Sequence, residues 1–134
     1  MRFIGAVLAL GLIQAAYAQP PEIPQGVRDI IEQTADEQGL ITLGQPYFDE
    51  IDDGYEDTVE VTVAPDRLTY IMVRGNDDTI AIDVRATAGG KEIVDWTDAE
   101  VLQIPAGNGN KVTLDVEMTC EFISCEYFVQ AFVR

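Results

Sequence analysis

The amino-acid sequence predicts an all-β protein, an antiparallel β-sandwich preceded by one short amphipathic helix. Apolar and polar residues alternate over several runs in the second half of the chain, which is the pattern of strands with one face in water. Clusters of Gly, Asn, Asp and Pro separate these runs, as hairpin turns do. No helical pattern lies between the runs, so the strands have no crossover helices that would make them parallel.

At least seven strands are expected. The segments 70–73 and 127–133 are apolar on both faces, which is typical of strands in the middle of a sheet or beneath a helix. The predicted strands are 59–63, 70–73, 80–85, 92–96, 101–104, 112–118 and 127–133.

The expected helix follows a Pro-rich leader over residues 19–23. Pro24 suits the first turn of a helix, and Gly39 can adopt the left-handed cap, with Leu40 folding back on the last turn. An apolar stripe at helical spacing consists of Val27, Ile30, Ile31 and Ala35. The opposite face carries Arg28, Glu32, Asp36 and Glu37. Such a helix is expected to cover an edge of the sandwich and to face water with its other side; the alternative is a partner-binding helix.

The first eighteen residues have the three parts of a secretory signal peptide. Arg2 gives a basic start, residues 3–13 are an almost unbroken apolar run, and 16–18 form a small-x-small cleavage site. The run is too short to span a bilayer, which takes about 20 residues. We therefore expect an exported protein, periplasmic or extracellular, without membrane insertion. The predicted organisation is a signal peptide (1–18), a leader with helix and acidic loop (19–57), and a β-sandwich domain (58–134).

Composition excludes several classes of function. The formal net charge is −16 and becomes −17 when Arg2 is removed with the signal peptide. Such a surface repels phosphate groups and anionic lipids, which disfavours nucleic-acid and membrane binding and favours cationic partners. The chain has no histidine, so Ser-His-Asp and Cys-His catalysis and the usual zinc sites are excluded. We predict no enzyme activity and no catalytic residues; a hydrolase that uses carboxylates alone is the weakest alternative.

Cys120 and Cys125 are the only cysteines. In an exported protein such a pair predicts a disulfide. The loop it would close is short, so we expect a local clip on a hairpin that stabilises the fold by roughly 2 kcal/mol.

The densest acidic stretch, residues 49–57, is the candidate metal site. Calcium prefers six to eight oxygen ligands from a flexible loop, and this stretch offers several carboxylates around a glycine. An EF-hand is excluded because Ile51 occupies the third position and a strand follows. The candidate ligands are Asp49, Asp52, Asp53 and Asp57. The alternative is a solvated loop that keeps the protein soluble and blocks edge pairing. No cofactor is required, and calcium is the only one that the sequence suggests.

Two further features have a structural and a functional interpretation. The segment 76–78, with Asp83, could contribute to a second cation site, but Asn and Asp are also the residues that tight turns prefer. Trp96, the only tryptophan, could stack on a sugar or a cationic side chain, or it could cap the core.

Three stretches resemble the bacterial pre-peptidase C-terminal domain. Residues 68–73 resemble its strand that begins with a tyrosine, 77–84 its acidic turn before an apolar-Asp-apolar strand, and 90–95 its hairpin with a glycine, an apolar pair and an Asp. The ending 118–127 is similar to stand-alone secreted relatives with a disulfide-clipped hairpin. The resemblance covers about two thirds of the chain after residue 18. It implies a secreted β-sandwich of jelly-roll type without catalytic activity, and some relatives in collagenases bind calcium.

The predicted function is therefore an exported, non-catalytic module that binds a protein or glycan partner, or acts structurally, in the cell envelope or outside the cell. The main alternative is a calcium-dependent stability or adhesion module.

Overall fold

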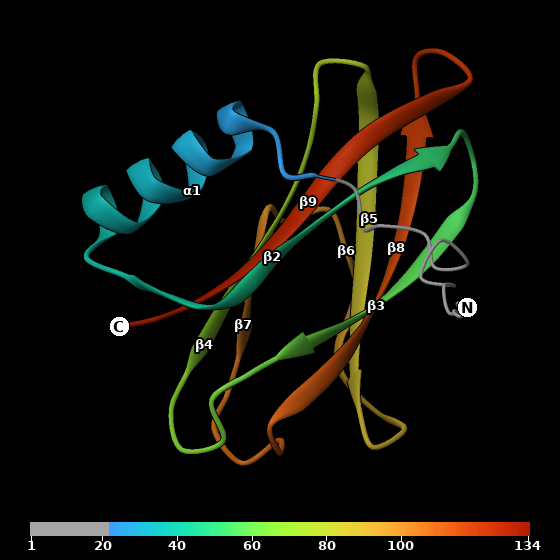
Figure 1. Ribbon diagram of the computed structural model, residues 1–134. Helices are drawn as coiled ribbons and strands as arrows, with labels where there is room; N and C mark the ends of the chain where they lie inside the picture. Colours follow the sequence, from blue (N-terminus) through green and yellow to red (C-terminus); the bar gives the residue numbers. More distant parts are fainter. Residues whose placement is uncertain (1–21) are drawn as a thin grey trace, which may run out of the picture.

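A computed structural model describes residues 22–134 of the chain, so the predicted signal peptide lies outside the described residues. Helix α1 is followed by eight strands, β2 to β9 (Figure 1). Their bounds are α1 (Gln25–Gln38), β2 (Ile41–Asp52), β3 (Glu56–Thr62), β4 (Thr69–Gly75), β5 (Thr79–Ala88), β6 (Lys91–Thr97), β7 (Val101–Ile104), β8 (Lys111–Cys120) and β9 (Ser124–Val133). Within residues 22–134 no helix is long and apolar enough to cross a bilayer.

The strands form two antiparallel four-stranded sheets, in the orders β2-β9-β4-β7 and β3-β8-β5-β6. The pairs are nested: β2 lies beside β9, β3 beside β8, β4 beside β7 and β5 beside β6. This is the strand order of a jelly roll, an eight-stranded double sheet of Greek-key strands. The predicted all-β sandwich of jelly-roll type with one short helix is therefore confirmed.

The main core lies between the two sheets and is built by residues that alternate along each strand. Strand β8 is the clearest example, because every second residue from Val112 to Met118 is almost completely buried. The residues between them face outward on the second sheet. This two-residue period is the reason why the strand positions could be predicted from the sequence.

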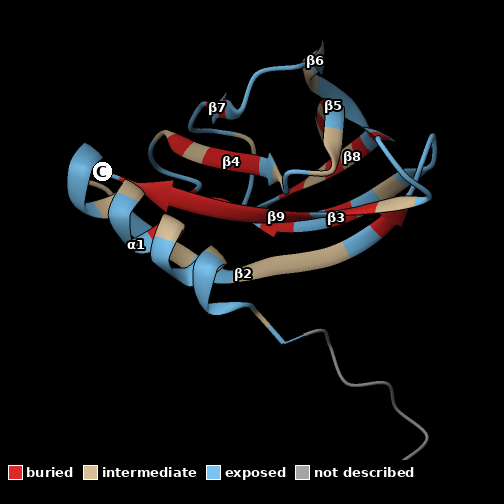
Figure 2. Cartoon of the chain, turned by 90° about the horizontal axis from the view of Figure 1, so that it is seen from above, coloured by how far each residue is buried: buried red, intermediate tan, exposed pale blue. Residues whose placement is uncertain are grey.

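Helix α1 covers the outer face of β9 and β4 and creates a second, smaller core. Ile31 packs there with Met72, Phe128 and Phe132. Figure 2 shows α1 against this sheet, with β9 buried along most of its length. The helix thus explains why 70–73 and 127–133 are apolar on both faces. As predicted, Gly39 ends the helix in the left-handed conformation (φ 65°).

The predicted acidic loop over 49–57 is wrong for residues 49–52, which belong to β2, and for residues 56–57, which belong to β3. Strand β2 begins at Ile41 and pairs with β9 as far as Asp52, so the sandwich begins well before the expected boundary at residue 58. β2 is an edge strand, and its register with β9 shifts between Leu43 and Tyr47. An edge strand with a bulge tolerates polar residues and Pro46, so its sequence lacks regular alternation.

Candidate functional site

The four predicted calcium ligands lie in two separate places. Asp49 and Asp57 approach a pair of tyrosines between the sheets, whereas Asp52 and Asp53 lie at the turn between β2 and β3. Within residues 22–134 no group of three or more His, Cys, Asp or Glu side chains is arranged to hold a metal ion. The structure therefore does not assemble the four aspartates into one site.

The tyrosine pair, Tyr47 on β2 and Tyr127 on β9, has ring centroids 6.0 Å apart. The Tyr47 hydroxyl donates a hydrogen bond to Asp49 Oδ2 (2.9 Å) and the Tyr127 hydroxyl donates one to Asp57 Oδ2 (2.6 Å). Burial, followed by the hydrogen bond to Asp49, raises the pKa of Tyr47 to about 12. Burial and then the bond to Asp57 raise the pKa of Tyr127 far above its usual range. Because Asp57 belongs to β3, the Tyr127 bond ties the two sheets together.

Hydrogen bonds join three turns at one end of the sandwich, each of which connects a strand of one sheet to a strand of the other. The backbone N–H of Asp53 donates to the carbonyl of Ile123 (2.9 Å), and Asp53 Oδ1 accepts from the N–H of Cys120 (2.8 Å). The N–H of Glu121 donates to the carbonyl of Asp78 (2.8 Å). These bonds connect the β8–β9 turn to both the β2–β3 turn and the β4–β5 turn. Asp53, a predicted calcium ligand, thus acts as a structural acceptor.

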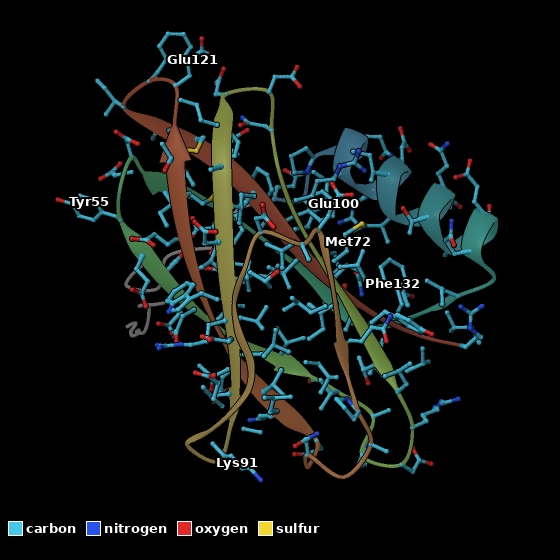
Figure 3. The ribbon with its side chains drawn as sticks, turned by 180° about the vertical axis from the view of Figure 1, so that it is seen from behind. Tyr55, Met72, Lys91, Glu100, Glu121 and Phe132 are labelled. Carbon is cyan, nitrogen blue, oxygen red and sulfur yellow. A yellow bond between two sulfur atoms is a disulfide. The ribbon has the colours of Figure 1, made fainter. Side chains whose placement is uncertain are left out.

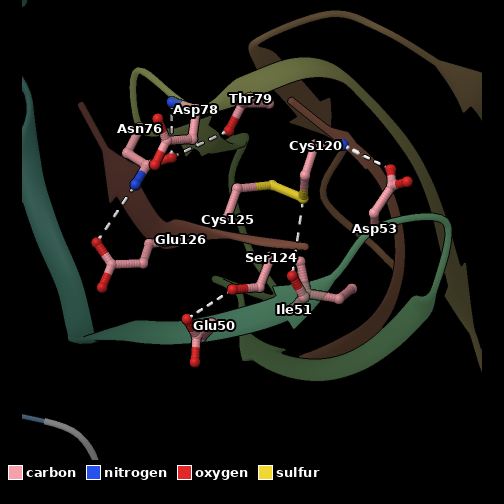
Figure 4. The surroundings of a disulfide bond; sticks show 10 residues. All are labelled: Glu50, Ile51, Asp53, Asn76, Asp78, Thr79, Cys120, Ser124, Cys125 and Glu126. Carbon is pink, nitrogen blue, oxygen red and sulfur yellow. Dashed lines mark hydrogen bonds between the residues drawn. A yellow bond between two sulfur atoms is a disulfide. The ribbon is translucent and has the colours of Figure 1, made fainter. Parts of the chain in front are cut away.

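A disulfide between Cys120 and Cys125 closes the base of the β8–β9 turn, with the Cα atoms 5.6 Å apart. The predicted disulfide is therefore present, and both cysteines are buried. The expected hairpin is wrong, because β8 and β9 belong to different sheets and the clipped turn crosses from one sheet to the other. Figure 4 shows the bridge with two neighbouring contacts, from Ser124 Oγ to Glu50 (2.8 Å) and from the Cys120 N–H to Asp53. The turn is held at its base by a covalent bond and on both sides by hydrogen bonds.

The clipped turn presents two large apolar side chains to solvent. Phe122 is 64% exposed and Ile123 is 85% exposed. Tyr55, on the hydrogen-bonded β2–β3 turn, is 66% exposed. In Figure 3 Tyr55 points away from the sandwich at the end where Glu121 lies. We call Tyr55, Phe122 and Ile123 the apolar tip.

The three turns at the end of the sandwich that carries the apolar tip are acidic. None of the segments 50–57, 75–80 and 119–127 contains Lys or Arg. The exposed acids of these segments include Asp52, Asp77, Glu121 and Glu126. This end of the sandwich therefore combines exposed apolar side chains with carboxylates and carries no cation on its three turns, so its charge attracts cationic groups before contact.

The remaining candidates have structural roles. Asn76 Oδ1 accepts a hydrogen bond from the N–H of Asp78 (3.2 Å), which is the turn chemistry that the sequence offered as the alternative. Trp96 lies at the surface of the second sheet, where the Arg85 guanidinium is 4.9 Å from its ring centroid. Arg85 also forms an ion pair with Asp115 (2.6 Å). The cation that stacks on Trp96 therefore comes from the chain itself.

Sequence reasoning missed the apolar tip. The signal was present, because Phe122 and Ile123 stand together between two cysteines expected to form a clipped hairpin. Adjacent apolar residues at the tip of so short a loop have no core to enter, so they must face solvent. The contacts among the three turns carry no comparable sequence signal.

No family model and no curated protein matches this chain.

Proposed function

We propose that this protein is an exported, non-catalytic binding module that docks a cationic protein partner with its apolar tip. The observation that carries the proposal is the exposure of Phe122 and Ile123 on a turn held by a disulfide and by hydrogen bonds to both neighbouring turns. Export is supported by the same disulfide, since such bonds persist in oxidising compartments, and by the predicted signal peptide.

The rigidity of the turn favours binding. A mobile loop loses conformational entropy when it docks, at a cost of about 0.5–1.5 kcal/mol for each immobilised side chain. Here the covalent clip at Cys120–Cys125 fixes the turn before any partner arrives. Aromatic residues often carry a large share of the affinity at protein interfaces, and Phe122 is placed to act as such an anchor.

Charge selects the class of partner. Anionic lipids and nucleic acids are repelled by a chain of net charge −16 whose three turns at this end lack any Lys or Arg. A glycan needs hydrogen-bonding groups beside a stacking ring, whereas the branched side chain of Ile123 offers neither. A protein surface with an apolar hollow and basic residues around it can bind the apolar tip and also pair with the acidic residues of the three turns.

Photo-crosslinking tests this proposal. A photoreactive amino acid is placed at Phe122, or at the exposed Val101 as the control, in the full chain expressed in its native host. Val101 lies on the edge strand β7, and its neighbour Glu100 lies away from Tyr55 and Glu121 in Figure 3. The expected result is a discrete protein adduct from position 122 alone. Equal or absent adducts at both positions contradict the proposal.

Binding of the purified adduct partner provides the quantitative test. The double variant Phe122→Ser/Ile123→Ser is expected to weaken binding at least 10-fold, because two exposed apolar anchors are removed without disturbing the core. The control Val101→Ser should leave the affinity unchanged. Raising sodium chloride from 50 to 500 mM should slow association, as expected for acids steering a basic surface. Unchanged affinity in the double variant would refute the role of the tip.

A further inference from the structure

A second candidate site lies far from the apolar tip, between α1 and the bulged part of β2. It is a hollow of about 620 Å³, within the size range of sites for small ligands. Apolar side chains of Ile31, Ala35 and Leu40 line one part, and the bulge of residues 44–46 lines another. Figures 1 and 2 show α1 beside the first half of β2.

Gln130 is the unusual residue of this hollow. It lies on β9 between Phe128 and Phe132, on the face covered by the helix, and it is only 2% exposed. The bulge in β2 interrupts the backbone pairing with β9 between Leu43 and Tyr47. There the Gln130 side chain, rather than the backbone of β9, donates hydrogen bonds to β2 carbonyls. Its Nε2 donates to the carbonyls of Leu43 (3.3 Å), Gly44 (3.3 Å) and Ala131 (2.8 Å).

These three carbonyls fix the orientation of the Gln130 amide. If the amide were rotated by 180°, its Oε1 would face three acceptors and no donor. With the nitrogen directed at the bulge, the oxygen is the atom of the amide that can still accept a hydrogen bond, and Gln130 lines the hollow. No donor among residues 22–134 is bonded to this oxygen. Buried acceptors in native proteins are almost always satisfied, and the hollow is the side from which a ligand can bring a hydrogen-bond donor to this oxygen.

The rim of the hollow indicates the charge of that donor. Glu32 and Asp36 lie one turn apart on α1 and both line the hollow. Arg28 is the only cation in the described lining. Two carboxylates and a buried carbonyl oxygen repel an anionic ligand and favour a cation that carries N–H groups.

We infer that this hollow binds a primary alkylammonium group. Its three N–H donors can reach Gln130 Oε1 and the carboxylates of Glu32 and Asp36, while its alkyl chain lies on Ile31 and Ala35. A lysine side chain of a peptide and a free alkylamine share this chemistry. The site is independent of the apolar tip, since it lies at the opposite end of β2 from the turn that carries Tyr55.

The test uses the full exported chain labelled with ¹⁵N and titrated with n-butylammonium chloride at constant ionic strength. We expect saturable shifts of the Gln130 side-chain amide and of the backbone amides of Ile31 and Ala35. Tetramethylammonium chloride is the control, because it has the same charge and no N–H donor. Equal responses to the two salts, or no saturable shift at Gln130, would overturn the inference.

Charge variants on the exposed face of α1 provide the second arm, since they leave the core intact. The variant Glu32→Gln/Asp36→Asn should weaken butylammonium binding about 3- to 10-fold, as expected for two exposed ion pairs. The matched control Asp29→Asn/Glu37→Gln removes the same charge from the same helix outside the hollow and should leave the affinity unchanged. Equal weakening in both variants would show that butylammonium responds to the overall charge of the helix and not to a site in the hollow, and this would overturn the inference.

A comparison of ligands identifies the source of the ammonium group. A pentapeptide with a central lysine, flanked by alanines and capped at both ends, is titrated beside cadaverine. Tighter binding of the peptide assigns the hollow to a lysine of a partner, and tighter binding of cadaverine assigns it to a free amine. Absence of binding by both contradicts the alkylammonium site.

Discussion

The hydrogen bond between Tyr127 and Asp57 gives the sharpest prediction about stability. Tyr127 is buried, its hydroxyl is 2.6 Å from Asp57 Oδ2, and the bond joins β9 of one sheet to β3 of the other. The substitution Tyr127→Phe removes this hydroxyl and keeps the ring. Asp57, which is half-buried, then loses its hydrogen-bond donor. A second carboxylate, Asp49, is bonded to the neighbouring Tyr47.

The expected cost follows from the nature of the bond. A hydrogen bond to a charged group contributes about 1.5–3 kcal/mol, so Tyr127→Phe should lower the free energy of unfolding by about 2 kcal/mol. In a domain of this size that corresponds to a fall in Tm of about 6–10 °C. Urea denaturation followed by circular dichroism measures the free energy directly.

Two controls separate this bond from the general effect of a lost hydroxyl. Tyr55→Phe removes the hydroxyl of an exposed tyrosine and should change the free energy of unfolding by less than about 0.5 kcal/mol. Asp57→Asn should destabilise the wild type more than it destabilises the Tyr127→Phe variant, because that variant has already lost the bond. The double-mutant cycle of these two substitutions should give a coupling energy of about 1 kcal/mol or more. If Tyr127→Phe is as stable as Tyr55→Phe, the reasoning is refuted.

Three further predictions concern pH, the disulfide and calcium. The pKa of Tyr47 is raised to about 12 from 10.0, so its stabilising contribution is complete below pH 10 and is lost as the pH rises towards 12; urea midpoints should fall over this range, and less steeply in Tyr47→Phe. Cys120→Ala/Cys125→Ala should fold but lose about 2 kcal/mol in urea denaturation, from the entropy of a six-residue loop; an unchanged midpoint would show that the hydrogen bonds around the turn already hold it. Because the four candidate aspartates are separated, thermal melts with calcium, with chelator and with sodium chloride at matched ionic strength should coincide, and a calcium-specific rise in Tm would contradict this.

Much of the fold could be predicted because burial imposes a period on the sequence. Strand β8 alternates strictly, since one face enters the core and the other faces water. The helix was predictable for the same reason, with Pro24 before it and Gly39 after it. The two-sided apolar strands β4 and β9 are central in their sheet, as expected, because α1 covers the face that the second sheet does not.

The rest could not be predicted, because it depends on contacts between distant segments. Strand β2 is a polar edge strand with a bulge, so its sequence lacks the alternating pattern. Its acidic residues therefore suggested a loop. The roles of Asp53 and Asp57 follow from partners on β8 and β9 that are 67 and 70 residues away in the sequence. The likeness to the pre-peptidase C-terminal domain stays a prediction, although the jelly-roll strand order that it implied is present.

Chemical footprinting in the native setting is the most direct test of the docking role. Hydroxyl-radical labelling, read by mass spectrometry, reports the exposure of Phe122 and Ile123 in the purified protein and in the exported fraction of the native host. We predict strong labelling of both residues when the protein is pure and several-fold protection in the native fraction, with Val101 equally labelled in the two samples. Equal labelling of Phe122 and Ile123 in both samples would contradict the proposed docking of a partner on the apolar tip.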